Sequence, residues 1–214
     1  MFLTKINKSI LNFYLNLQAG LNYGVFRRKD FNVTGTTLMF YDMGTTGTTA
    51  TIATFHTIKH KDDYESNPQL VIRGVGFDQT LGGNAFAGRL AKHFAQKFLE
   101  KTKKDIFTNP KAIVKLYKEA DRVKNVLSAN ADHMAQIEGL MDDVDFKLKV
   151  TRKEFEAMCA DLFERVKNPA NDAIKLAEII PEEIKSVILV GGSTRIPRVQ
   201  DELMKATQKY LIFI

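Results

Sequence analysis

Two glycines, two hydroxyl side chains and an arginine follow directly after a short apolar run near the end of the chain. The run Val187–Val190 has no polar alternation, which predicts a strand buried on both faces. Gly191 and Gly192 permit a sharp turn and a close ligand approach. Ser193 offers a hydroxyl group, and Arg195 offers a planar cation that can stack on a nucleobase or pair with phosphate. This pattern predicts a nucleotide site; the alternative is a plain strand-to-helix turn with an N-cap.

A second segment that could bind phosphate follows the predicted strand Thr37–Met43. The sequence from Asp42 to Thr49 is Asp-Met-Gly-Thr-Thr-Gly-Thr-Thr, and a second predicted strand runs from Thr49 to Ile58. Backbone N–H groups in such turns form anion-binding nests, and a carboxylate at a strand end suits Mg²⁺ near phosphates. The alternative interpretation is a plain β-hairpin with a Gly-Thr loop.

A third set of polar side chains lies on the helix predicted for residues 111–128. Asp121, Lys124 and Ser128 are three and four positions apart, so they share one helix face. An acid, a base and a hydroxyl on one stripe could hold a sugar and the edge of a base. The alternative is a solvated helix face with an i,i+3 ion pair.

Alternating strands and helices are predicted to position these segments. A third strand is expected at Gln69–Gly76, and a helix follows Leu81–Gly83 with apolar residues every four positions. A strand pair is expected at Asp132–Gly139 and Asp145–Val150. Near the end of the chain, Pro197 suits the first turn of another helix.

Between the strand pair and the Gly-Gly turn, a long helix is predicted with an interruption. Thr151 and Glu154 form a capping-box pattern at its start, and Asn168-Pro169 is expected to interrupt it. The last residues, Tyr210–Ile214, are apolar and have no evident partner in the pattern.

Composition limits the classes of partner. The chain has 214 residues, of which 44% are hydrophobic and 26% charged, as in ordinary globular proteins. Its formal net charge of +6 comes from basic residues spread along the chain, so no nucleic-acid partner is expected. No run of 18 apolar residues occurs, so no membrane association is expected. The single cysteine, Cys159, lies on an apolar helix face and is predicted to be buried.

The order of the predicted elements resembles the ribonuclease-H-like core of one lobe of an actin-like ATPase, an α/β fold. Residues 106–150 would form an α+β subdomain inserted into this lobe. The segment Leu189–Pro197 is similar to the adenosine loop of the 70-kilodalton heat-shock chaperone family, and Leu127–Phe146 resembles the family's large, hypoxia up-regulated branch. The resemblance covers residues 19–206 and leaves 1–18 and 207–214 unmatched.

This resemblance implies an adenine nucleotide, ATP or ADP, with Mg²⁺ as the cofactor. The phosphates and the metal would face Asp42, directly or through water, together with Gly44, Gly47, Thr48, Gly82 and Gly83. Adenosine would be held by Lys124, Ser128, Gly191, Gly192, Ser193, Arg195 and Ile196. Three positions depart from the family pattern, because Thr46 stands in a turn of glycines, Thr49 replaces an aspartate and Asn125 replaces an arginine. No catalytic residue is assigned.

In function, the resemblance implies a parent protein that binds ATP, holds unfolded client proteins and assists nucleotide exchange on a partner chaperone in the endoplasmic reticulum lumen. The chain itself resembles only the second lobe of the nucleotide-binding domain, so we expect a truncated gene product with weak nucleotide binding and no useful turnover. The alternative is a non-catalytic docking module, or nucleotide-exchange partner, of another heat-shock 70 chaperone.

Overall fold

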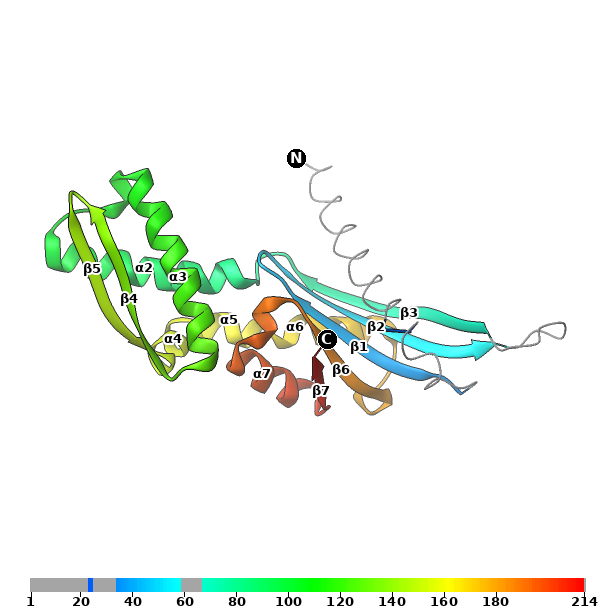
Figure 1. Ribbon diagram of the computed structural model, residues 1–214. Coiled ribbons are helices and arrows are strands. Elements are labelled where there is room, and N and C mark those ends of the chain that lie inside the picture. Colours follow the sequence, from blue (N-terminus) through cyan, green and yellow to red (C-terminus); the bar gives the residue numbers. More distant parts are fainter. Residues whose placement is uncertain (1–22, 25–33, 59–66, 214) are drawn as a thin grey trace.

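The computed structural model describes residues 23–24, 34–58 and 67–213 of the chain. An open sheet lies at one end of the molecule, and an assembly of two helices with a strand pair lies at the other (Figure 1). Residues 1–18, which the family resemblance leaves unmatched, lie outside the described residues.

The main sheet has five strands in the order β3-β2-β1-β6-β7. Its members are β1 (Thr36–Met43), β2 (Thr48–Ile58), β3 (Asn67–Asp78), β6 (Ile184–Val190) and β7 (Leu211–Phe213). The first three strands pair antiparallel, whereas β6 runs parallel to β1 and β7 runs parallel to β6. This order, three antiparallel strands followed by two parallel additions, confirms the predicted ribonuclease-H-like α/β fold class.

The strand β7 corrects one expectation. The residues from Tyr210 onward are apolar without an evident partner in the sequence, but Leu211 pairs with Val187 of β6. The Val187 N–H group donates to the Tyr210 carbonyl at 3.0 Å. A segment this short carries too little pattern to predict a strand, and its partner lies in the tertiary structure.

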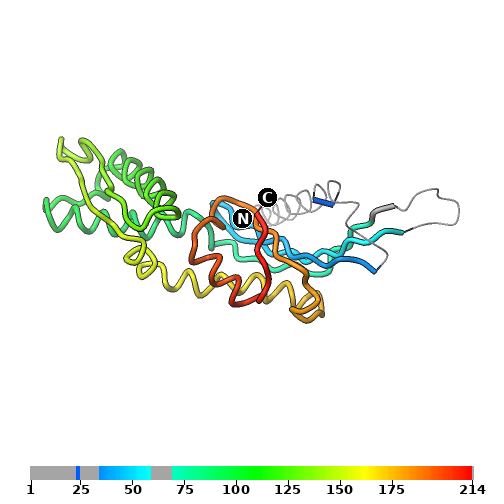
Figure 2. Tube along the Cα trace, turned by 60° about the horizontal axis from the view of Figure 1, so that its bottom comes forward, coloured from blue at the N-terminus to red at the C-terminus, as the bar shows by residue number. Residues whose placement is uncertain are grey.

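Four helices lie between the second strand pair and the end of the sheet in the chain; they are α4 (Arg152–Met158), α5 (Ala160–Arg165), α6 (Lys167–Ala177) and α7 (Pro197–Thr207), with short 3₁₀ turns at Pro181–Glu183 and Gly192–Arg195. The helices α6 and α7 pack on one face of the sheet, whereas α4 packs against the α+β assembly at the other end (Figures 1 and 2). The predicted capping box is present, since the Thr151 Oγ1 accepts from the Glu154 N–H group at 3.2 Å.

The predicted interruption at Asn168-Pro169 is wrong. The helical segments break at Cys159 and Val166, and Pro169 lies inside the first turn of α6. Proline is tolerated there because the N–H groups of a first turn have no intrahelical partner to lose. Cys159 is fully buried, as predicted, and burial raises the pKa of its thiol to about 12.

The second part of the molecule is built on a long helix. It contains α2 (Gly83–Thr102), a 3₁₀ turn (Ile106–Thr108), α3 (Pro110–Ala129), β4 (Asp132–Met141) and β5 (Val144–Thr151). The strands β4 and β5 form the predicted antiparallel pair. This α+β assembly joins the sheet through α2, whose N-terminus begins beside the β1–β2 turn (Figure 1).

Aromatic rings hold α2 to both parts. Near its start, Phe86 packs against Phe163 of α5 with ring centroids 5.1 Å apart. Two turns further on, Phe94 packs against Phe146 of β5 at 5.5 Å. The face of α2 that the sequence predicts as apolar is therefore core along its whole length, and α2 fixes the distance between the sheet and the α+β assembly.

A buried hydroxyl group contacts the break between α5 and α6. The Tyr41 side chain is fully buried in β1, and its hydroxyl donates to the Val166 carbonyl at 2.9 Å, at the break between α5 and α6. Burial raises the pKa of this phenol well above its ordinary value, so the hydroxyl stays protonated. The bond ties the central strand to the helix layer.

We expect Tyr41→Phe to lower the free energy of unfolding by about 1–2 kcal/mol, because a buried carbonyl loses a donor and no water replaces it. Urea unfolding monitored by far-ultraviolet circular dichroism measures the change. Tyr117→Phe is the matched control, since Tyr117 is 46% exposed on α3. Equal midpoints for the two variants would contradict a stabilising role for the Tyr41 hydroxyl.

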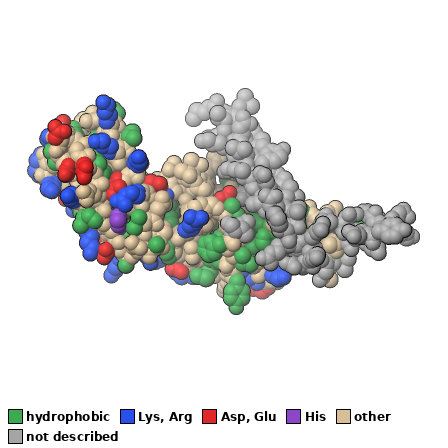
Figure 3. Space-filling model, viewed as in Figure 1, with side chains coloured by type: hydrophobic (Ala, Val, Ile, Leu, Met, Phe, Trp, Pro, Cys, Tyr) green, Lys and Arg blue, Asp and Glu red, His purple; other side chains and the backbone are tan. Residues whose placement is uncertain are grey.

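Charged side chains of both signs are interspersed over the visible surface of the α+β end (Figure 3). This mixture agrees with a solvated surface rather than with a single basic patch. Within the described part of the chain, no helix is long and apolar enough to cross a membrane.

Candidate functional site: a cavity between two glycine turns and α3

The two glycine-containing turns lie side by side because their strands are neighbours. Asp42 of β1 pairs in parallel with Val190 of β6, so the carboxyl ends of both strands meet at one edge of the sheet. In open α/β sheets, ligands bind beyond the carboxyl ends of such strands. The strand pairing therefore brings both sequence-predicted motifs to one place.

The turn between β1 and β2 is closed by its own backbone and held by the start of α2. The Gly44 N–H group donates to the Gly47 carbonyl at 3.0 Å. The N–H groups of Gly83 and Asn84 donate to the carbonyls of Gly44 and Thr45 at 2.9 and 2.8 Å. The first amides of α2 are thus used to fix the turn, so they do not face an incoming anion.

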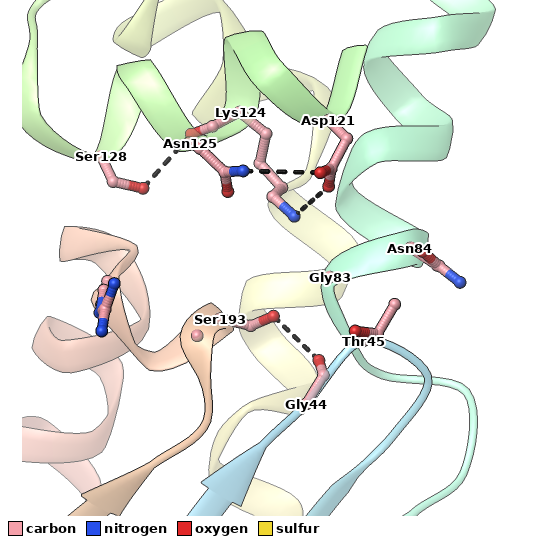
Figure 4. Close-up of a pocket in the computed structure, with 11 residues that line it drawn as sticks. Gly44, Thr45, Gly83, Asn84, Asp121, Lys124, Asn125, Ser128 and Ser193 are labelled. Carbon is pink, nitrogen blue, oxygen red and sulfur yellow. Dashed lines mark hydrogen bonds and ion pairs between the residues drawn. The ribbon is translucent and has the colours of Figure 1, made fainter. Parts of the chain in front are cut away.

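The turn after β6 requires a glycine at its first position. Gly191 has φ of 87°, and a Cβ atom there would lie 2.5 Å from both the Asp42 Oδ1 and the Met43 carbonyl oxygen. The following 3₁₀ turn is tied to the first turn, because the Ser193 hydroxyl donates to the Gly44 carbonyl at 2.9 Å (Figure 4). The two turns therefore form one connected floor.

The opposite wall comes from α3. Lys124 is only 7% exposed, and its ammonium group lies 2.6 Å from Asp121 Oδ1. The amide of Asn125 donates to Asp121 Oδ2 at 3.5 Å, and the Ser128 hydroxyl donates to the Lys124 carbonyl at 3.3 Å (Figure 4). The i,i+3 ion pair of the alternative interpretation is present, but these side chains also line a cavity rather than an open helix face.

The cavity between this wall and the two turns has a volume of about 500 Å³. Its lining contains the sequence-predicted residues Gly44, Gly83, Lys124, Ser128, Gly192, Ser193 and Arg195. The charged side chains of the lining are Asp121, Lys124 and Arg195, an excess of positive charge that suits an anionic ligand. Arg195 is exposed and makes no hydrogen bond or ion pair with the described residues, so its guanidinium is available to a ligand.

The other predicted residues do not line the cavity; they are Asp42, Gly47, Thr48, Gly82, Gly191 and Ile196. Thr48 is buried, and its hydroxyl donates to the Leu81 carbonyl at 2.6 Å, so this hydroxyl ties the start of β2 to the segment before α2. Ile196 is 3% exposed and belongs to the apolar core, so only its backbone could contact a ligand. Gly82 packs against the backbone of the turn.

Asp42 is the carboxylate that could serve a metal ion. It is half-buried at the end of β1, and burial raises the pKa of its carboxyl group. The described residues contain no group of three or more His, Cys, Asp and Glu side chains that could enclose a cation. Mg²⁺ keeps several waters and uses one or two carboxylates together with substrate phosphates, and a single half-buried Asp42 fits that mode.

Two lining residues, Thr45 and Asn84, are not among the residues predicted from the sequence. Both come from the contact between the β1–β2 turn and α2, where the Asn84 N–H group donates to the Thr45 carbonyl. A polar residue immediately after Gly82-Gly83, at the start of a helix, is the signal that could have identified Asn84. Nothing in the local sequence distinguishes Thr45 from Thr46 beside it.

Comparison with known proteins agrees with this geometry. Residues 16–212 match the family described as Hsp70 protein. The chain is similar to hypoxia up-regulated protein 1 of Danio rerio, with 59% identity over 196 residues, and of Homo sapiens, with 58% identity over 198 residues. The protein of that name from Xenopus laevis is also 59% identical.

These alignments cover 91% of this chain but only 20% of the Danio rerio and Homo sapiens proteins and 30% of the Xenopus laevis protein. The identity is consistent with a portion of the large endoplasmic-reticulum branch, and the fold is that of an actin-like ATPase lobe. From the family match across almost its whole length, the chain belongs to the Hsp70 family.

Proposed function

We propose that the chain is the second lobe of an Hsp70-type nucleotide-binding domain, spanning residues 19–206 with an inserted subdomain at about 106–150, and that it binds an adenine nucleotide. The observation that supports this most is the shared cavity of the two glycine turns and α3, with Lys124 buried and Arg195 free at its lining. Segments that are far apart in the sequence meet at this cavity, and its polar, positively charged lining suits an anionic ligand.

Each wall would hold a different part of the nucleotide. The β1–β2 turn, with Gly44 and Thr45, would face the phosphates, and Asp42 would hold Mg²⁺ through water. The planar cation of Arg195 would stack on the base. The polar stripe of α3, including Ser128, would hold the sugar and the edge of the base.

Binding by these 214 residues would be weak and without useful turnover. Phosphoryl transfer depends on positioned groups and charges all around the phosphates. The described residues supply one carboxylate, Asp42, at the phosphate end, and the first amides of α2 are already used by the turn. When bound, Mg²⁺ would neutralise phosphate charge at this end.

The roles of a whole chaperone are part of the same proposal. The parent protein would hold unfolded clients, act with a partner heat-shock 70 chaperone and work in the endoplasmic reticulum lumen. Membership of the family and similarity to hypoxia up-regulated protein 1 support this part of the proposal. No role for nucleic acid or membrane is proposed.

The occupied amides at the start of α2 favour a second candidate function, a non-catalytic docking module for another heat-shock 70 chaperone. Such a module would keep the fold and the α3 wall without needing strong phosphate contacts. Partner binding that persists in a variant unable to bind nucleotide would separate the two functions.

We expect calorimetric titration with ATP and ADP to show saturable binding that Arg195→Ala weakens about tenfold, because one charge-assisted contact is lost. Titrations with and without Mg²⁺ measure the contribution of the metal. Arg198→Ala is the matched control, since Arg198 lies outside the cavity and pairs with Glu202 at 2.9 Å. If a chain that is demonstrably folded bound neither ATP nor ADP, the nucleotide site would be rejected, and the docking module would be the function that remains.

A further inference from the structure

The outer edge of β7 presents apolar side chains to solvent. This strand stands last in the sheet order β3-β2-β1-β6-β7, so no described strand lies beyond it. Tyr210, Ile212 and Phe213 are all exposed, and Tyr210 retains 87% of its accessible surface. Figure 3 shows hydrophobic side chains gathered over this part of the sheet. Single exposed apolar residues are ordinary, but a group of them on the edge of a sheet marks an interaction surface.

The backbone of β7 points away from the sheet at alternate residues. The Tyr210 carbonyl accepts from the Val187 N–H group of β6 at 3.0 Å, so it points toward β6. Because the polar groups of successive residues in a strand point to opposite sides, those of Ile212 also face β6. The N–H and C=O groups of Leu211 and Phe213 therefore point outward, where they can bond a further strand.

The sequence of this edge does little to prevent pairing. Edge strands are blunted by proline, by charged side chains or by their short length. The strand at the other edge of the sheet, β3, carries Pro68 and Arg73, whereas β7 has its short length alone. Residues 210–214 contain no charge, proline or glycine. Uncharged apolar segments of high β-propensity pair with identical copies of themselves, so the edge suits a weak pairing with its own copy.

We propose that the outer edge of β7 pairs antiparallel with the same edge of a second copy of this chain, and that the two copies form a weak two-fold dimer. An antiparallel pairing is isologous, since both copies contribute the same residues. Leu211 of each copy lies opposite Phe213 of the other, and the two exchange both N–H···O bonds. Ile212 lies opposite Ile212 of the second copy, at the position where side chains approach most closely. The pairing needs no nucleotide and is independent of the proposed function.

Sedimentation velocity of the full chain without nucleotide measures this pairing. We expect the weight-average mass to rise above the 24.2 kDa of one chain as the concentration increases from about 1 to 100 μM, as for a small and transient interface. Ile212→Lys and Ile212→Glu each place like charges opposite one another, so each should weaken self-association about tenfold or more. Met204→Lys is the matched control, because Met204 is similarly exposed but lies on α7.

An equimolar mixture of the two Ile212 variants tests the two-fold arrangement. Their opposite charges meet across the axis, so the mixture should recover association to within a few-fold of the wild type. Urea unfolding of each variant shows that it is folded. A mixture that stays as monomeric as its parts would overturn the antiparallel arrangement.

Two further results would overturn the pairing itself. One is a wild type that stays monomeric up to about 100 μM, and the other is equal association of the wild type and both Ile212 variants. If a monomeric wild type instead bound an extended Tyr-Leu-Ile-Phe peptide, and Ile212→Lys lost that binding, the edge would take extended segments of other proteins rather than its own copy.

Discussion

Replacing Gly76 by alanine is expected to destabilise the fold by about 3 kcal/mol or more, because the helix layer lies directly against the backbone of β3. A Cβ atom at Gly76 would lie 2.0 Å from the Pro169 carbonyl oxygen and 2.8 Å from the Ala173 nitrogen. Both are backbone atoms of α6, so no side chain can rotate to make room. Either α6 separates from the sheet or the strand bends.

Urea unfolding of Gly76→Ala measures this cost, and a variant that fails to fold agrees with it. Gly88→Ala is the matched control within the same chain, since no heavy atom lies within 4 Å of the place that its new methyl group would take on α2. Alanine there should stabilise the helix by up to about 1 kcal/mol. A loss below about 1 kcal/mol for Gly76→Ala would mean that α6 is not held as tightly as the contacts indicate.

Replacing Gly191 by alanine is expected to lower adenine-nucleotide affinity at least about tenfold and to destabilise the chain by about 2 kcal/mol. The residue has φ of 87°, a region that side-chain-bearing residues rarely adopt. Its new methyl group would also lie 2.5 Å from Asp42 Oδ1. Relief of this contact displaces the Gly191-Gly192 turn, and with it Ser193 and Arg195.

Gly139→Ala separates backbone strain from steric contact. Gly139 also has a positive φ, 50°, but no heavy atom lies within 4 Å of its Cβ position, and it belongs to β4 outside the nucleotide cavity. This control should cost about 1 kcal/mol and leave nucleotide affinity unchanged. Calorimetry and urea unfolding of both variants measure the two effects. Equal affinities for Gly191→Ala and the wild type would show that the turn does not shape the site.

The strands and long helices could be predicted because their patterns are local. The apolar run of β6, the alternation in β2 and the four-residue repeat of α2 each predict an element that the structure contains. The strand β7 could not be predicted, because it depends on pairing with β6. The helix breaks at Cys159 and Val166 have no signal in the local sequence, and the break at Val166 lies where the Tyr41 hydroxyl bonds the Val166 carbonyl.

The candidate site likewise contains features that the local sequence predicts and features that depend on tertiary contacts. Glycines such as Gly191 predict sharp turns from residue type alone, and the spacing of Asp121 and Lys124 predicts their ion pair. The hydroxyl of Thr48 could not be placed, because it depends on the Leu81 carbonyl, which lies 33 positions away in the chain. Contacts that join distant segments decided which polar groups face the cavity.

The parallel pairing of β1 with β6 has a consequence for the order of folding. Ser193 and Gly44 are joined by a hydrogen bond across 149 positions, so the centre of the sheet is assembled from the two ends of the described chain. Contacts of such long sequence range form slowly, since loop closure precedes any gain from pairing. During synthesis, β1 with its buried Met39 and Tyr41 can pair at once with β2 but lacks β6 until the residues from Ile184 onward have left the ribosome, and an unpaired edge of this kind favours aggregation while it lasts.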